Sequence, residues 1–335
     1  AETRTSRVVT LLAVLGILVA AEFGLGVVAV EMIEHGLDLS FGLIMGVVGS
    51  AALICIVLAH FLLTVTAAQL TPVSENRSTK IRLSLLLLNA IVVSLCAFWI
   101  GRFKSPEAAL FVLCGGATLM VIWTLAGSML VAESPVITPR VQRELPRSFL
   151  ARAAFTWLTP GPETGLVFAV LNILLLAILG VYAFHWIDVF LSPTVATGRN
   201  ILRGFVFGYV AYLTCFLVVV YGLMRIVRRK NNARVEIGFA ALAVVAVFAA
   251  LLPYGIGLYL SDFRYFQYSI WQSTNWAWTL YEVLDGNDLT ASIILVAGLG
   301  AIGVFSVLFS SPHLVSPRRI ATPKRVLQER GNTGQ

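Results

Sequence analysis

Eight apolar stretches of more than 20 residues dominate this 335-residue chain, and they restrict the fold it can adopt. About 20 apolar residues in a helix cross the hydrocarbon core of a bilayer. A backbone in lipid must satisfy its own hydrogen bonds, and the stretches are too long and too uniformly apolar for barrel strands. The sequence therefore predicts an all-α, polytopic transmembrane helix bundle of about eight spans. The predicted spans are 8–31, 41–69, 81–101, 107–132, 164–189, 201–225, 235–260 and 289–310.

The composition supports a lipid environment. Only 12% of the residues are charged, whereas a globular protein has roughly 25%. The four cysteines lie inside apolar stretches and form no CxxC pair, so neither a disulfide framework nor a zinc site is expected. The first stretch is longer than the apolar core of a signal peptide, and we expect it to be a span. The lipid bilayer is thus the first predicted partner.

Lys and Arg predict the orientation of the spans. With the N-terminus inside, 19 of the 24 Lys and Arg residues fall in the inner segments, and every inner segment is basic. The sequence therefore predicts a multi-pass protein of the cell inner membrane with both termini cytoplasmic. The net charge of +7 then faces an anionic leaflet, so no nucleic-acid partner is expected.

The connections divide the predicted bundle into parts. We expect a first four-span half at 1–132, a cytoplasmic linker at 133–163, a second four-span half at 164–310 and a basic cytoplasmic tail at 311–335. Within the linker, 147–158 is too short to span. Its aromatic and aliphatic residues with two arginines predict an interfacial helix between spans 4 and 5.

Ionisable residues within spans are costly and are candidates for function. Glu22 and His60 are the intramembrane polar candidates, with either a structural role or a role in transport or proton movement. A bis-histidine haem needs two imidazoles that face one iron. His60 and His185 are predicted at different depths, so no cofactor is expected. No nucleophile, metal-binding or nucleotide-binding motif is found, so neither a catalytic residue nor an enzyme activity is predicted. An intramembrane enzyme or redox protein is the third alternative.

The outer loop between the last two spans is rich in aromatic residues. Trp271, Trp276 and Trp278 are its tryptophans. They fit an aromatic belt on a re-entrant or surface-lying segment. The alternative is a lid or docking surface for an amphiphile or a partner protein.

Three segments of the chain can be compared with a known family: AAQLTPVSENRSTKIRLSLLL at 67–87, YSIWQSTNWAWTL at 268–280 and SPRRIATPKRV at 316–326. They resemble parts of ABC-2-type transporter permeases of bacteria. The resemblance implies a dimeric permease that acts with a separate ATPase subunit to move a substrate across the membrane. It also implies that the inner turn 72–80 contacts the ATPase. Such permeases usually have six spans and an interfacial helix before the first, whereas this chain has eight predicted spans and the interfacial helix before the fifth.

A partner surface is predicted on the inner side from these segments. The predicted contact residues are Glu75, Arg77, Lys80, Arg82, Arg143 and Arg147. An alternative function is a non-catalytic membrane-embedded subunit of a larger respiratory or photosynthetic complex. The scarcity of intramembrane charge favours it, because a route for a polar substrate usually needs more lining groups.

Overall fold

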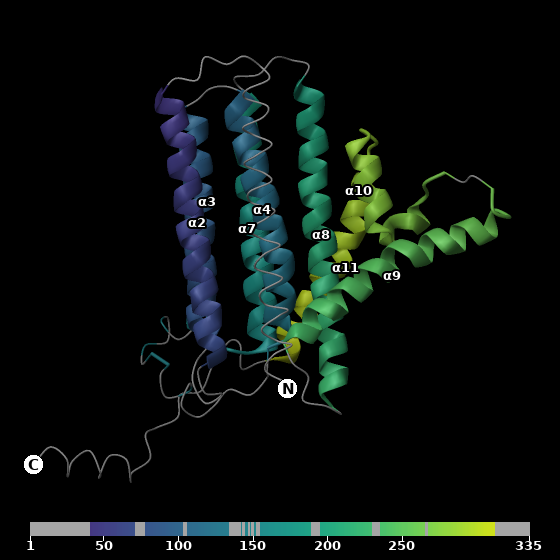
Figure 1. The fold of residues 1–335 in the computed structure, drawn as a ribbon. Coiled ribbons are helices and arrows are strands. Elements are labelled where there is room, and N and C mark those ends of the chain that lie inside the picture. Colours follow the sequence, from purple (N-terminus) through teal and green to yellow (C-terminus); the bar gives the residue numbers. More distant parts are fainter. Residues whose placement is uncertain are drawn as a thin grey trace, which may run out of the picture.

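The computed structural model describes a bundle of long helices (Figure 1). It describes residues 41–70, 78–102, 106–133, 155–188, 195–229, 235–264 and 267–311, with isolated positions between 142 and 151. In this part of the chain there are eight α-helices and one short 3₁₀ helix, and no strand. The prediction of an all-helical fold is confirmed for these residues.

Seven of the helices are long and apolar enough to cross a membrane. They are α2 (Phe41–Leu70), α3 (Ser78–Arg102), α4 (Pro106–Val131), α7 (Pro162–Asp188), α8 (Val195–Arg228), α9 (Glu236–Leu260) and α11 (Thr290–Ser310). Each corresponds to a predicted span, and α8 begins six residues earlier than predicted. The first predicted span, 8–31, lies outside the described residues. The chain is therefore a helical, multi-pass membrane protein.

Local sequence signals explain several of the helix ends. Pro106 and Pro162 are the first residues of α4 and α7. Proline suits this position because its ring presets the helical φ and the missing N–H would have had no partner within the helix. Two short helices lie between α9 and α11, namely η1 (Ile270–Thr274) and α10 (Trp276–Leu284). The side chain of Asn275 caps α10 by accepting from the Trp278 N–H at 3.1 Å.

The helices pack as a row of neighbours. The most extensive contacts are those of α2 with α3, α4 with α7, and α8 with α11, while α7 and α8 join the middle of the row. Figure 1 shows α2, α3, α4, α7 and α8 close to parallel, whereas α9 leans away from them. Because Gly165 lies against Leu130 and Gly161 bonds to Glu133, the end of α4 and the start of α7 lie at the same end of the bundle. The proposed division into two halves stays a prediction.

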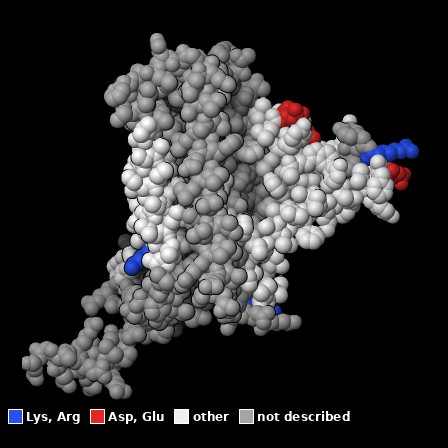
Figure 2. All heavy atoms as spheres, viewed as in Figure 1, with Lys and Arg blue, Asp and Glu red and all other residues white. Residues whose placement is uncertain are grey.

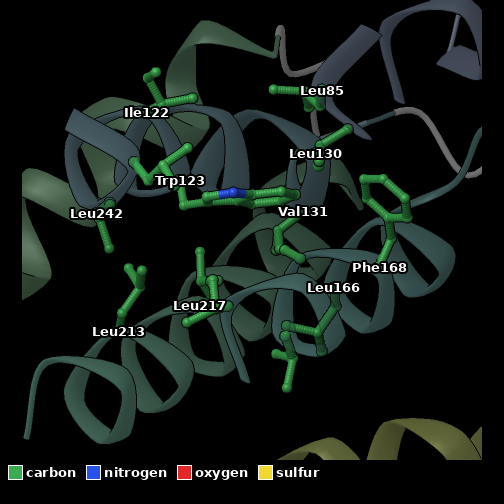
Figure 3. Close-up of a cluster of buried hydrophobic side chains, with 14 of the residues drawn as sticks. Leu85, Ile122, Trp123, Leu130, Val131, Leu166, Phe168, Leu213, Leu217 and Leu242 are labelled. Atoms are coloured by element: carbon green, nitrogen blue, oxygen red, sulfur yellow. The ribbon is translucent and has the colours of Figure 1, made fainter. Parts of the chain in front are cut away.

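The main apolar core lies between α3, α4, α7 and α8. Trp123 of α4 is at its centre, with Leu85 of α3, Phe168 of α7 and Leu217 of α8 around it (Figure 3). In lipid, helices associate through close packing because lipid tails are as apolar as the side chains. Gly165 shows how close α7 comes to α4, because a Cβ there would lie 2.2 Å from the Leu130 carbonyl oxygen.

The outward faces of the helices are also apolar. Large hydrophobic side chains are exposed along α7, α9 and α11, among them Leu175, Phe248, Leu260 and Phe305. In water such a surface would be an aggregation hazard. On this protein it is the surface that contacts the bilayer.

Candidate functional site

The main polar site of the described chain is built on Arg82, in the first turns of α3. Its side chain has no exposed area, and its Nη2 donates to Oε2 of Glu133 at 2.6 Å. Glu133 follows the end of α4 and is 14% exposed. A buried cation is stable only with well-placed acceptors, and this pair satisfies that condition.

Two backbone carbonyls also accept hydrogen bonds from the guanidinium. Its Nη1 donates to the Trp157 carbonyl at 2.7 Å, and its Nη2 also donates to the Gly161 carbonyl at 3.3 Å. The Phe168 ring lies below the guanidinium, with its centroid 5.6 Å from Cζ. This distance allows a cation–π interaction. One side chain therefore joins α3, the chain after α4 and the chain before α7.

The carboxylate of Glu133 is equally well satisfied. Its Oε1 accepts from the Ser78 hydroxyl at 2.6 Å, and its Oε2 accepts from the Gly161 N–H at 3.0 Å. We call Ser78, Arg82, Glu133 and Gly161 the α3–α7 clasp. Beside it, the Thr79 hydroxyl donates to the Leu158 carbonyl at 2.7 Å.

The turn before α7 depends on a glycine. Gly161 has a φ of +150°, a conformation that residues with a Cβ rarely adopt. This conformation directs its N–H to Glu133 and its carbonyl to Arg82. The Thr164 hydroxyl, with its one hydrogen, lies between two acceptors, the Gly161 carbonyl at 2.9 Å and the Thr159 carbonyl at 2.8 Å, and this contact holds the turn.

The end of α8 extends this polar network. The Arg228 guanidinium donates to the Ala132 carbonyl, and the Tyr221 hydroxyl donates to Glu163 Oε1 at 3.1 Å. Four helices thus meet through polar contacts at one end of the bundle. In Figure 2 the described part of the visible face is almost entirely uncharged between its ends.

The predicted partner-contact residues differ in their surroundings. Lys80 is exposed, whereas Arg82, two residues later, is fully buried in the clasp. Arg82 therefore binds groups within the protein and is not available to a partner. Among the described residues of the predicted contact set, Lys80 is exposed. The remaining members lie outside the described residues: Glu75, Arg77, Arg143 and Arg147.

Of the two polar residues predicted within the membrane, the structure describes one. His60 is on the exposed face of α2, and its carbonyl accepts from the Thr64 hydroxyl at 2.8 Å. Glu22 lies outside the described residues. No cluster of three or more His, Cys, Asp or Glu that could hold a metal occurs within the described ranges.

The three tryptophans between α9 and α11 have different surroundings. The Trp276 indole N–H donates to the Ala246 carbonyl of α9 at 2.8 Å, and the Trp278 indole N–H donates to Glu282 at 2.7 Å. Trp271 is 87% exposed. Two tryptophans therefore hold the loop in place, and the third projects from it.

A second polar network, inside the bundle, was missed by the sequence analysis. The Asn89 amide donates to the Asn172 side chain at 3.1 Å, and the Trp123 indole donates to Asn89 at 3.0 Å. These contacts join α3, α4 and α7 within the apolar core. Asparagines in the middle of predicted spans were the available signal. Glu133 was missed because the Lys and Arg count takes no account of acidic partners.

No family model, curated protein or solved structure matches the chain. Its class is thus defined by the fold and the site, as a multi-pass helical membrane protein with a buried ion-pair network at one end.

Proposed function

We propose that this chain is a permease-like membrane subunit that acts with a separate ATPase to move a substrate across the membrane. The proposal includes eight spans, an interfacial helix between spans 4 and 5, cytoplasmic termini and a bacterial inner membrane. The observation that carries it is the α3–α7 clasp, which attaches the start of α3 to the end of α4 and the start of α7. The segment resembling the ATPase-contacting turn leads directly into this start of α3.

The clasp supports coupling between a partner and the bundle. A partner that binds the turn before α3 acts on a helix end that is tied to two other helices through a buried ion pair. Packed interiors move as units rather than deforming continuously. A displacement of the turn would therefore move α3, α4 and α7 together.

The charge at the same end supports an inner-side partner. Lys80 is exposed beside the clasp, and Arg225 and Arg228 lie in the last turn of α8. A basic end is expected on the cytoplasmic side, where an ATPase would bind.

The test is copurification from native membranes with charge reversal. Lys80→Glu should reduce the amount of associated ATPase several-fold while insertion and the yield of folded protein are unchanged. Arg264→Glu is the matched control, because Arg264 is exposed in the segment after α9. Equal ATPase recovery from both variants would contradict the proposed contact.

Transport itself is tested in sealed vesicles that contain the purified complex. ATP should drive a flux that vesicles with the membrane subunit alone do not show. If no ATPase associates and ATP drives no flux, the permease function fails.

A second candidate function is a non-catalytic subunit of a larger respiratory or photosynthetic complex. The exposed apolar groups of the outer loop favour it, since Trp271, Phe263 and Ile270 project from the loop. Mass spectrometry of proteins copurified in mild detergent separates the two candidates, because one predicts an ATPase and the other predicts membrane subunits of a complex. A particle with no copurifying protein would count against both.

A further inference from the structure

A large cavity lies at the end of the bundle farthest from the clasp. Its volume is about 720 Å³, and α3, α4, α7 and α8 all contribute to its wall. The lining runs over 93–101, 112–123, 173–184 and 202–210, which are the halves of these helices away from the clasp. This volume is within the range of roughly 300–1,000 Å³ that is typical of ligand pockets.

Glycines in the wall leave the volume of this cavity unfilled. A Cβ built on Gly101, Gly116 or Gly180, all in the wall, would meet no atom within 4 Å. Near the clasp the same helices touch, since a Cβ on Gly165 would lie 2.2 Å from the Leu130 carbonyl oxygen. Thus α4 and α7 are in close contact at one end and diverge toward the other, and the small residues on the diverging halves keep the space open.

The wall offers little to a polar ligand. The Tyr209 hydroxyl lies 2.6 Å from the Met120 carbonyl, to which it donates, and 2.7 Å from the Thr124 hydroxyl. The Trp123 indole N–H donates to Asn89, so it is not available to a ligand. Most of the other described lining side chains are aliphatic or aromatic. A polar solute would lose its hydration here without gaining hydrogen bonds, whereas hydrocarbon would lose nothing.

The cavity is continuous with the surface that contacts lipid. Leu113 and Tyr182 belong to the wall and, at 36% and 58% exposed, are also among the exposed large hydrophobic residues of the protein. They are part of the apolar exterior that faces the bilayer, so hydrocarbon can enter sideways from the membrane. We propose that this cavity binds one hydrocarbon chain of a bilayer phospholipid. This site is independent of any ATPase and of transport.

The first test fills the cavity. Gly116→Leu and Gly180→Leu place side chains in open space, and Gly298→Leu on α11 is the matched control because its Cβ also meets nothing within 4 Å but lies outside the cavity wall. Native mass spectrometry after exchange into mild detergent with phosphatidylcholine should show about one retained lipid per wild-type or Gly298→Leu chain. Retention should fall at least five-fold in each cavity variant. Equal retention in correctly folded cavity variants would overturn the proposal.

A second measurement uses the unmodified protein, so it does not depend on whether the leucine variants fold. Phosphatidylcholine with a photoreactive diazirine in its acyl chain is incorporated in vesicles with the protein and illuminated. Crosslinks should concentrate on 112–123 and 173–184, at several times the level found on α11. Crosslinks spread evenly over all lipid-facing helices would overturn the proposal.

Segment 8–31 of the same chain is the alternative occupant of the cavity, and a disulfide experiment tests for it. A cysteine at position 116 that forms a disulfide with cysteines introduced in 8–31, together with the absence of retained lipid, would assign the cavity to protein and overturn the proposal. If ATP drives no flux but the lipid is retained, the proposed function is rejected and the lipid site is still supported.

Discussion

Arg82 shows how a single charged side chain can be stable at the edge of the membrane core. It is fully buried. Glu133 and the carbonyls of Trp157 and Gly161 accept from its two terminal nitrogens, whereas its Nε has no hydrogen-bond partner among the described residues. Taking the two charges out of water costs several kcal/mol each, and the ion pair with its hydrogen bonds offsets this cost. The cost of burial is offset only while both Arg82 and Glu133 are present.

Replacing Arg82 should therefore be strongly destabilising. We expect Arg82→Ala to lower the free energy of unfolding in detergent by about 3–5 kcal/mol, since it leaves Glu133 without its cation. Lys80→Ala, on the exposed side of the same turn, should change it by less than about 0.5 kcal/mol. Denaturant titration followed by circular dichroism measures both. Similar losses in the two variants would show that the ion pair is not the source of stability.

Asp288 gives a pH-dependent contribution at the start of α11. Its carboxylate accepts from the Thr290 hydroxyl at 2.6 Å and the Thr290 N–H at 3.1 Å, and these hydrogen bonds lower the pKa of Asp288 below its ordinary value of 3.8. A group with a lowered pKa in the folded state stabilises above the ordinary pKa and loses this effect as the pH falls through the folded pKa. Asp288→Ala should thus lower the unfolding midpoint at pH 7, and the difference from wild type should shrink below pH 4. A difference that is constant from pH 7 to pH 3 would contradict this assignment.

At the scale of helices, the contact between α4 and α7 is the closest that the glycines reveal. Gly165 lies against the Leu130 backbone, whereas Gly180, four turns later on the same helix, faces open space. These two glycines give a matched pair for testing how the helices diverge.

Gly165→Ala should destabilise the bundle by about 1–3 kcal/mol or more, because its Cβ overlaps backbone that cannot move freely. Gly180→Ala should be neutral or stabilising by up to about 1 kcal/mol, since alanine is the better helix former. Thermal unfolding of the two variants in the same detergent measures the difference. Equal effects would mean that the two ends of α7 are packed alike.

The helices could be predicted from sequence because length and apolarity alone determine a span. Their pairing could not, because helices such as α2 and α9 are apolar on all sides and have no polar face to indicate a direction. The α3–α7 clasp could not be predicted from the sequence for a related reason. Arg82 and Lys80 count equally as basic residues near a span end, and only the position of Glu133 in space distinguishes them.

For the whole molecule, the described helices predict a topology that can be measured. Five long helices separate Lys80 from Arg264, namely α3, α4, α7, α8 and α9. An odd number of crossings puts the two positions on opposite sides of the membrane. In a cysteine-free background, a membrane-impermeant maleimide should label a cysteine at 264 in intact cells and a cysteine at 80 only after lysis. Labelling of both from the same side would contradict the helix count.

The distance along the chain between Arg82 and its acceptors has a consequence for synthesis. Glu133 follows Arg82 by 51 residues, and Trp157 follows it by 75. At about 5–20 residues per second, Arg82 is synthesised roughly 3–10 s before Glu133. During that interval the guanidinium lacks the acceptors that it has in the finished bundle, so the start of α3 cannot yet make its final contacts. The bundle is thus completed in an order set by its own ion pair, with α3 settling only after the end of α4 has been made.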